Sequence, residues 1–311
     1  MLIMIDVSII HPSSLDEAVE LAVEGWLPLA GGTDIVPRLS FGLLQTANLI
    51  AVGNLPDLAG IRKTNDFLLL GSATTLNEIS DHPLTPPWLR DAVVRTANRI
   101  IRNRATLGGN LVQGRRCRYY NRPVQWREAS GHCRRTGGSV CFAGESIPGC
   151  SAGFRSLIAA VLIASGSMVY IRTPNGIETM ELYSLYQNIP PLEDLRVGGL
   201  ITAIAVPMKS AGETVRSAVL TRRASLDYPE IAVAIRHMKQ DSRSTETTIV
   251  MTAPLPRPSR YVVTESQGDT NDHMMGWLES VIPAANTGLY GPEYLRMAAY
   301  RLISRTMISD I

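Results

Sequence analysis

Long hydrophobic runs and an excess of charge of either sign are both missing from this 311-residue sequence. Its longest apolar stretch, residues 157–169, is interrupted by serines and a glycine, so we expect no membrane insertion. The formal net charge of +2 gives no general attraction to nucleic acid. The five histidines are scattered, and the sequence shows no pattern typical of a catalytic triad or of paired carboxylates.

A secretory signal is also not evident. The first residues lack a basic start, and Asp6 interrupts their short apolar run. We therefore expect a cytoplasmic protein, a setting in which disulfides are rare. The hydrophobic content of 45% and charged content of 19% are those of an ordinary globular protein, and the length favours two domains.

Cysteine is absent outside one segment, residues 117–150. That segment holds all four thiols, which are Cys117, Cys133, Cys141 and Cys150. Four soft ligands in one polar stretch indicate a shared metal, a cluster or two disulfides. The intervals of 16, 8 and 9 residues contain no close pair of the kind that zinc sites use, whereas iron–sulfur clusters accept wide spacings. Spacing alone favours a cluster and leaves zinc, uninvolved cysteines and redox cysteines open.

Arginines crowd the same segment, where Glu128 and Glu145 are the only acidic residues. Nearby cations stabilise the negative charge of a cluster held by four thiolates and tune its potential. A solvated basic loop or a docking face for an acidic partner would have the same composition. The arginines are Arg115, Arg116, Arg118, Arg122, Arg127, Arg134 and Arg135.

Two Gly-Gly pairs stand out in the first half of the chain, in AGGTD (30–34) and ATLGGN (105–110). Paired glycines let the backbone approach a ligand closely, and consecutive amides bind anions. Neither pair fits the dinucleotide fingerprint or a P-loop. One such loop is more often a tight turn, but two together could hold one elongated phosphate-bearing ligand.

The hydrophobic pattern predicts an α+β protein. Helices are expected over residues 13–24 and 86–102, the second with Leu89, Val93, Ala97, Ile100 and Ile101 on one face. Strands are expected within residues 1–10, 48–52 and 199–206, with a hairpin turn at 174–176. After a loosened stretch at 209–214, further strands precede a mostly helical end from about residue 272 to 307.

These pieces, in order LPLAGGTDIVP, LGSATTLNEI, ATLGGNLVQ, LITAIAVP, RRASLDYPEIAVA and YLRMAAYRLISRTM, resemble the FAD-binding medium subunit of the molybdenum hydroxylase family. Xanthine dehydrogenase and carbon monoxide dehydrogenase belong to that family. The resemblance covers nearly the whole chain. It implies an FAD-binding domain in two parts over residues 1–208, interrupted by a cysteine loop at about 114–152, and a smaller α+β domain of sheet plus helices over 213–311.

The resemblance also implies that the two glycine loops hold the FAD pyrophosphate and that a few residues outside them reach the flavin. The residues it places on FAD are Leu29, Ala30, Gly31, Gly32, Thr33, Asp34, Ala105, Thr106, Gly108, Gly109, Asn110, Leu200 and Arg222. Relatives carry an acidic residue early in the helix after the insertion. Leu157 stands there in this sequence, and Ser156 is the candidate to replace that contact.

The cysteine insertion resembles the loop of one branch, typified by the β-subunit of 4-hydroxybenzoyl-CoA reductase. The match includes RCRYYN, the Trp126-Arg127 pair, GHC and the cysteine intervals. It implies a 4Fe–4S cluster held by Cys117, Cys133, Cys141 and Cys150. His132 is then expected beside the site rather than as a ligand. Tyr119 and Tyr120 would pack either between flavin and cluster or within the loop.

The resemblance implies an electron-transfer subunit without a general acid, base or nucleophile of its own. Substrate chemistry would occur on a molybdenum-cofactor large subunit, with a 2Fe–2S small subunit in a heterohexamer and a ferredoxin-like external carrier. One alternative is an FAD subunit whose cysteine loop is a zinc-bound or redox-inert staple. Another is a nucleic-acid-binding protein that uses the arginine loop as a zinc-type module, which the near-neutral net charge disfavours.

Overall fold

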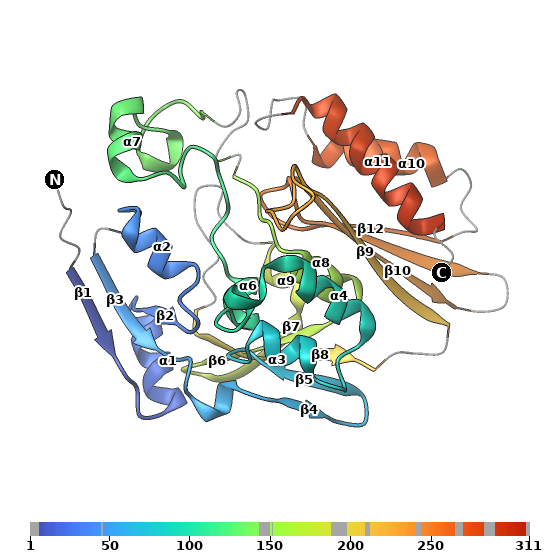
Figure 1. Ribbon diagram of the computed structural model, residues 1–311. Coiled ribbons are helices and arrows are strands. Elements are labelled where there is room, and N and C mark those ends of the chain that lie inside the picture. Colours follow the sequence, from blue (N-terminus) through green and yellow to red (C-terminus); the bar gives the residue numbers. More distant parts are fainter. Residues whose placement is uncertain are drawn as a thin grey trace.

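Within the residues that the structure describes, the chain forms three β-sheets with flanking helices (Figure 1). The computed structural model describes residues 6–44, 46–142, 150, 152–187, 198–208, 212–240, 244–264, 270–282 and 290–308. No helix in these ranges is both long enough and apolar enough to span a membrane.

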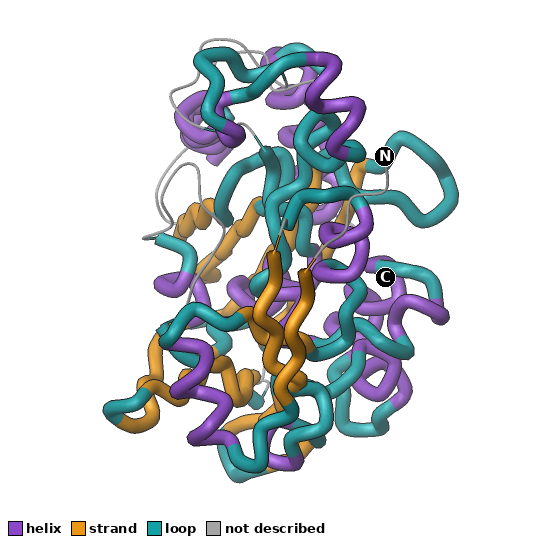
Figure 2. The backbone as a smooth tube through the Cα atoms, turned by 90° about the vertical axis from the view of Figure 1, so that its left-hand side faces the viewer, coloured by secondary structure: helices purple, strands orange, loops and turns teal. Residues whose placement is uncertain are grey.

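The first sheet is parallel and carries the first glycine loop. Its strands are β1 (Asp6–Ile10), β3 (Thr46–Ala51) and β2 (Leu27–Leu29), in that order. β1 and β3 lie side by side at the surface of the molecule (Figure 2). The helix α1 (Leu15–Val23) joins β1 to β2, and the loop after β2 leads into α2 (Ile35–Ser40). The sheet therefore fixes where the AGGTD loop begins.

The second sheet is antiparallel and has the order β4-β5-β8-β6-β7. Its strands are β4 (Ile61–Lys63), β5 (Phe67–Gly71), β8 (Leu200–Pro207), β6 (Met168–Thr173) and β7 (Gly176–Glu181). The predicted hairpin turn joins β6 to β7, where Thr173 pairs with Gly176. The helical segments beside it are η1 (Pro56–Leu58), α3 (Leu76–Asp81), α4 (Pro87–Thr96), α5 (Arg99–Arg102), α6 (Leu107–Leu111), α8 (Leu157–Ala164) and α9 (Leu182–Leu185).

The third sheet is antiparallel, in the order β12-β11-β10-β9, and lies between two helical layers (Figure 1). It consists of β9 (Glu213–Leu220), β10 (Ile231–Lys239), β11 (Thr245–Met251) and β12 (Ser259–Thr264). The helices α10 (Thr270–Val281) and α11 (Pro292–Ile308) pack on one face, and α8 packs on the other. These strands and the helical end agree with the sequence-based prediction.

The central strand β10 shows why this sheet is buried on both faces. Ile231, Val233 and Ile235 join the core beneath α10 and α11, whereas Ala232 and Ala234 join the core around α8. Successive side chains of a strand point to opposite faces, so large residues fill one side and small ones admit the helix on the other. A single buried cluster thus includes residues from both sides of the predicted boundary near 209–212.

The helix α8 is apolar on every side, and each of its eight residues is buried. It contacts α4, β10 and β11, which leaves no face for solvent. A helix that is hydrophobic all round belongs in a core. The longest apolar run of the sequence is thus an internal helix that joins the second and third sheets.

One continuous helix over 86–102 was predicted, and that prediction is wrong. Helix α4 ends at Thr96, Ala97 is extended at φ −159°, and Asn98 caps the separate short helix α5. The Asn98 side chain accepts a hydrogen bond from the Ile101 backbone N–H at 2.9 Å. As a result Ile100 is 80% exposed instead of joining the face of Leu89 and Val93. A local cap therefore overrode the apolar periodicity.

The cysteine segment stands apart from the sheets, next to α2 (Figure 1). It contains α7 (Val124–Ser130) and the single turn η2 (Arg134–Thr136). The chain enters and leaves it at an isolated antiparallel bridge between Arg116 and Gly153. This bridge closes the base of the insertion close to the predicted limits of about 114 and 152.

Candidate functional site

The two glycine loops, far apart in the sequence, lie in direct contact. A Cβ atom on Gly31 would stand 1.7 Å from the carbonyl oxygen of Arg104 and 3.2 Å from the Cα of Ala105. On the second loop, a Cβ on Gly108 would stand 2.9 Å from the Cβ of Ser72. Neither position has room for a Cβ atom, because Gly31 packs against the backbone of Arg104 and Gly108 packs against Ser72. The predicted neighbourhood of the two loops is thus present in the fold.

The first loop offers a row of backbone donors. The N–H groups of Gly31, Gly32, Thr33, Asp34 and Ile35 have no hydrogen-bond partner among the described residues. Gly32 has φ +74°, which turns the chain so that neighbouring amides need not alternate in direction. Consecutive unpartnered amides of this kind form an anion-binding concavity. The loop therefore fits the pyrophosphate of a dinucleotide.

In the second loop, backbone N–H groups form hydrogen bonds within the protein. The Leu107 and Gly108 N–H groups donate to the carbonyls of Thr74 and Ser72, at 3.0 and 2.8 Å. The Gly109 N–H donates to the hydroxyl of Thr106 at 3.3 Å. This loop can thus contribute close packing and side chains to a ligand site, while the free backbone donors come from the first loop.

Ser156 holds the end of the second loop. This residue is fully buried, and its hydroxyl donates to Asn110 Oδ1 at 2.6 Å while accepting from the Ala159 N–H at 3.0 Å. It caps α8 and fixes the Asn110 amide with the same oxygen. Leu157 is 3% exposed and lies in the core. At the position where relatives carry an acidic residue, this chain therefore has a side chain that only packs against the core.

Replacing Ser156 by alanine is expected to lower the free energy of unfolding by about 2–3 kcal/mol. The change removes a helix cap and leaves the amide oxygen of Asn110 without its donor. Urea unfolding followed by circular dichroism measures the effect. The matched control is Ser14→Ala, because Ser14 caps the exposed helix α1 and its hydroxyl accepts only from the Glu17 N–H. Equal losses in the two variants would contradict the role of Asn110.

Asp34 of the first loop pairs with Arg116 at the start of the cysteine segment. Arg116 Nη2 lies 2.6 Å from Asp34 Oδ1, and the two side chains are 18% and 20% exposed. The Arg116 backbone forms both hydrogen bonds of the bridge to Gly153, and its guanidinium lies 5.1 Å from the ring centre of Tyr228. Arg116 thereby connects the glycine loop, the base of the insertion and the C-terminal part.

The other end of α2 also contacts the insertion. The Val124 N–H donates to the Phe41 carbonyl at 2.9 Å, and Arg127 Nη2 donates to the Gly42 carbonyl at 3.0 Å. The cysteine segment therefore binds α2 at both ends, next to Asp34 and next to Gly42. A displacement of the segment would be passed to the glycine loop through this short helix.

An Arg116→Gln variant is expected to lose about 2 kcal/mol of stability and to bind FAD about tenfold more weakly. Glutamine removes the closer of the two cations paired with the partly buried Asp34, since Arg38 lies 3.6 Å from its other carboxylate oxygen, and it loosens the N-terminal end of α2. Flavin fluorescence during dilution measures the affinity. Arg95→Gln serves as the control because Arg95 pairs with Asp91 on an exposed helix face. Unchanged FAD affinity in Arg116→Gln, with the protein folded, would contradict this role.

The four cysteines carry free thiols, of which Cys133 is buried and the other three are partly buried. Burial raises the pKa of the Cys117 thiol, and the nearby Cys150 and Cys141 raise that pKa further. The backbone N–H groups of Tyr120 and Tyr119 hydrogen-bond to the Cys117 sulfur and act in the opposite direction. Cys141 and Cys150 are therefore both close enough to Cys117 to affect its pKa.

The sulfur of Cys133, like that of Cys117, accepts a hydrogen bond. Its donor is the Thr136 hydroxyl at 3.6 Å, and the Cys133 carbonyl accepts a hydrogen bond from the Thr136 backbone N–H at 2.8 Å. Hydrogen bonds to sulfur are a feature of iron–sulfur sites, where they tune the potential. In the part of the chain that the structure describes, no group of three cysteine, histidine or carboxylate side chains is arranged to hold a metal. Residues 143–149 and 151, which flank Cys150, lie outside that part.

The tyrosines of the insertion pack mainly within it. Tyr119 stacks on Phe142 with ring centres 4.5 Å apart and meets Trp126 edge-on at 5.4 Å. Arg135 lies over the Tyr120 ring at 4.1 Å from its centre. These contacts match the loop-packing alternative of the sequence analysis, and they do not test a place beside the flavin.

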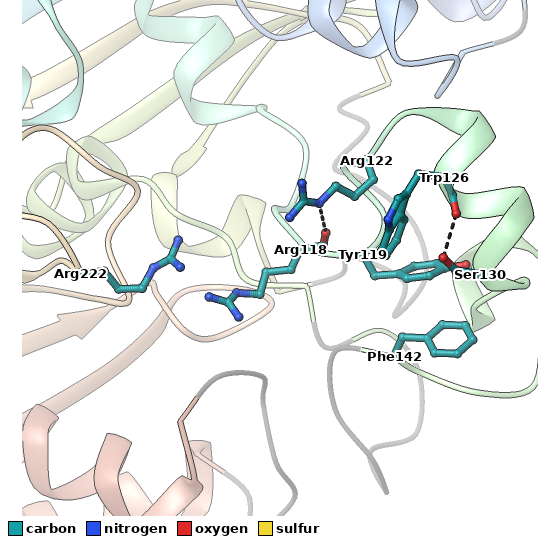
Figure 3. A pocket seen from close by; sticks show the side chains of 7 residues that line it. All are labelled: Arg118, Tyr119, Arg122, Trp126, Ser130, Phe142 and Arg222. Atoms are coloured by element: carbon teal, nitrogen blue, oxygen red, sulfur yellow. Dashed lines mark hydrogen bonds between the residues drawn. The ribbon is translucent and has the colours of Figure 1, made fainter.

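The two remaining predicted flavin contacts lie away from the glycine loops in sequence. Leu200 begins β8 and is buried in the core beside the first sheet. Arg222 follows β9, and its Nε lies 3.0 Å from Glu230 Oε1, while Arg155 binds the other oxygen of Glu230 at 3.2 Å. The Arg222 side chain faces Arg118 across a cavity (Figure 3). Sequence reasoning did not single out Arg155, or the roles of Arg116 and Arg118.

Comparison with known families identifies the class of domain to which this fold belongs. The family described as "FAD binding domain in molybdopterin dehydrogenase" matches residues 5–209. The chain therefore belongs to the FAD-binding medium-subunit family of the molybdenum hydroxylases. This membership and the architecture confirm the predicted α+β fold with its FAD-binding domain.

Several relatives are named medium subunits. The carbon monoxide dehydrogenase medium chain of Hydrogenophaga pseudoflava is 32% identical over 110 residues, which are 33% of this chain and only 38% of that one. The nicotine 6-hydroxylase medium subunit of Paenarthrobacter nicotinovorans is 25% identical over 245 residues, 77% of this chain and 72% of that one. The carbon monoxide dehydrogenase structure from H. pseudoflava superimposes with a TM-score of 0.73 and 20% identity, covering 99% and 97% of the two chains. This last likeness shows the fold alone.

Proposed function

We propose that this chain is the FAD- and iron–sulfur-bearing electron-transfer subunit of a multi-subunit, molybdenum-dependent hydroxylase, dehydrogenase or reductase. Within it, electrons would pass between FAD, a 4Fe–4S cluster and an external one-electron carrier. The observation that carries the cluster is the environment of the cysteines. The Cys117 sulfur receives backbone N–H donors, the Cys133 sulfur receives the Thr136 hydroxyl, and Cys141 and Cys150 lie near enough to affect the pKa of Cys117.

The flavin site rests on the first glycine loop. Bound FAD supplies exchange between two-electron and one-electron redox partners. The unpartnered amides of residues 31–35 would donate to its pyrophosphate, and Gly31 keeps this loop pressed against the second one. Asn110, held by Ser156, would present its amide at the same place. The chain's own residues thus bind and orient the cofactor, and no proton transfer by a side chain is needed.

The cysteine segment fits a cluster by donor chemistry. Soft thiolates favour iron–sulfur clusters, and such clusters are stabilised by N–H donors and by nearby cations. Cys117, Cys133, Cys141 and Cys150 would be the ligands, as in the branch typified by 4-hydroxybenzoyl-CoA reductase. Arginines 116 and 127 anchor the segment to α2, so the cluster would be fixed relative to the flavin loop.

The partners follow from the proposed role. Medium subunits are the named relatives, so we propose a molybdenum-cofactor large subunit and a 2Fe–2S small subunit, assembled as a heterohexamer, with a ferredoxin-like external carrier. The proposed domains remain residues 1–208 and 213–311. The buried cluster around α8 supports a firm association of the two, because it includes side chains from both.

The experiment is cofactor analysis of anaerobically purified protein. We expect about one FAD, about four iron and about four acid-labile sulfide per chain, with a cluster EPR signal after dithionite. Zinc without iron or sulfide would make the cysteine segment a structural staple and remove the cluster from the proposal. Folded protein that takes up neither flavin nor iron would overturn the whole assignment.

A further inference from the structure

The short helix α5 exposes its apolar side chains and buries a charged one. Ile100 is 80% exposed, more than any other large apolar side chain in the part of the chain that the structure describes, and Ile101 is 43% exposed. Arg102, in the same helix, is only 9% exposed. Hydrophobicity alone would give the opposite arrangement, so other contacts must hold α5 in this orientation.

Two polar contacts hold α5 in place. The Arg102 Nη1 donates to the carbonyls of Val94, at 3.1 Å, and of Ala97. A helix leaves its last carbonyls without partners inside the helix, and Arg102 supplies a donor at the end of α4. The Asn98 side chain caps the start of α5. The two isoleucines are therefore fixed on the outside, and they need no rearrangement to meet a partner.

Arginines flank the two isoleucines. Residues 81–104 contain five arginines and two aspartates. Arg95 pairs with Asp91 at 2.9 Å, and Arg99 lies 3.7 Å from Asp81. All four of these side chains are at least 45% exposed, and exposed ion pairs are weak, so the excess of positive charge persists. We call this region the α5 surface, and it consists of Val94, Arg95, Arg99, Ile100, Ile101 and Arg104.

An apolar centre with a charged border is the composition of a protein–protein contact. We propose that the α5 surface is the docking site of the 2Fe–2S small subunit, which would offer an apolar pocket bordered by carboxylates. This inference rests on the proposed function, which supplies that partner. Ile100 and Ile101 would enter the pocket, and the arginines would pair with the carboxylates.

The position of the α5 surface selects this subunit among the proposed partners. Arg104 follows α5, and its carbonyl is the group against which Gly31 of the first glycine loop packs. A protein seated on α5 would therefore lie beside the loop that holds FAD in our proposal. The 2Fe–2S subunit carries one-electron centres that have to exchange electrons with FAD, whereas the large subunit carries out the substrate chemistry.

Other occupants fit the α5 surface less well. Two copies of this chain would bring the arginines of one against those of the other. Membrane-surface elements are amphipathic helices with a wide apolar face, whereas α5 has four residues. A carrier that binds transiently does not need an apolar centre, which is a feature of permanent interfaces.

The direct test is photo-cross-linking in the complex, isolated from its native cells through a tag on this chain. A benzophenone amino acid in place of Ile100 is expected to link to the 2Fe–2S subunit, identified by mass spectrometry. The same amino acid in place of Ile177, which is 68% exposed on β7, is the control and is expected to give no such link. A link from position 100 to the large subunit, to a second copy of this chain or to nothing would overturn the proposal.

An Ile100→Asp variant tests the energy of the contact. It is expected to lower the amount of 2Fe–2S subunit recovered per chain at least about tenfold, because a carboxylate would then face the carboxylates of the partner. Ile100→Leu and Ile177→Asp are expected to retain that subunit. Circular dichroism establishes that the variants are folded. Full recovery of the subunit with Ile100→Asp would contradict the inference.

Two further results separate this inference from the proposed function. A wild-type complex without a 2Fe–2S subunit would contradict both. Cosedimentation of the wild-type chain with vesicles of phosphatidylcholine and phosphatidylglycerol, lost in Ile100→Asp, would assign the α5 surface to a membrane. That result would overturn this inference alone, because the FAD and iron content of the chain tests the proposed function independently.

Discussion

A Gly31→Ala substitution is expected to destabilise the protein by about 3 kcal/mol and to reduce bound FAD to less than about a tenth of the wild-type content. The added Cβ would stand 1.7 Å from the Arg104 carbonyl oxygen, so one of the two loops has to move. Both contacting groups belong to backbone, which cannot rotate away as a flexible side chain can. Movement of the first loop would disperse the amides of residues 31–35 that face the pyrophosphate in our proposal.

The matched control is Gly276→Ala. Gly276 lies inside α10 and does not have a positive φ, and a Cβ added there would have no neighbouring atom within 4 Å. Alanine at this position is expected to stabilise the helix by about 0.5–1 kcal/mol. Thermal unfolding and flavin absorbance of the two variants give the comparison. Retention of FAD by a folded Gly31→Ala protein would show that close loop contact is unnecessary.

The sequence predicted those elements whose burial follows from the pattern of residues adjacent in the chain. The alternation in β10, the apolar run of α8 and the two helical segments at the end of the chain are of this kind. The helix predicted over 86–102 failed for a local reason as well. Asn98 caps a new helix there, and this cap interrupts the apolar repeat.

The sequence predicted the residue types of the candidate site but not the contacts between them. The Gly-Gly pairs and the cysteines are visible in the sequence, since each needs only residue type and spacing. The pairing of Asp34 with Arg116 is not, because the two residues come from separate segments and any of seven arginines near the cysteines had the same chemistry. The same holds for Ser156, whose bond to Asn110 depends on the packing of α8 against α6.

The unequal roles of the two glycine loops also depend on tertiary structure. Both loops read alike, with paired glycines flanked by a hydroxyl and a polar side chain. Only the first keeps its amides free among the described residues, because the second forms hydrogen bonds to the loop at Ser72 and Thr74. Spatial contacts with other segments determine which backbone N–H groups form hydrogen bonds within the protein. Sequence spacing carries no information about those contacts.

Replacing Cys133 by serine is expected to reduce iron from about four per chain to nearly none while FAD stays at about one per chain. Serine has nearly the shape of cysteine and can accept the same hydrogen bond from the Thr136 hydroxyl, so the turn at η2 is expected to persist. A hydroxyl is, however, a poor ligand for iron in a cluster. Loss of iron from a folded protein that still holds FAD would therefore show that the Cys133 thiolate binds the iron.

The control for this prediction is His132→Ala. His132 adjoins Cys133 and is the only histidine of the cysteine segment, so it is the natural substitute ligand if one thiol is unused. Iron, sulfide and EPR intensity are expected to be retained in His132→Ala and lost in Cys133→Ser. The reverse result would assign the ligand to the imidazole. Full retention of iron in both variants would mean that the metal is held elsewhere, because a four-thiolate cluster with one ligand removed cannot keep its normal stability.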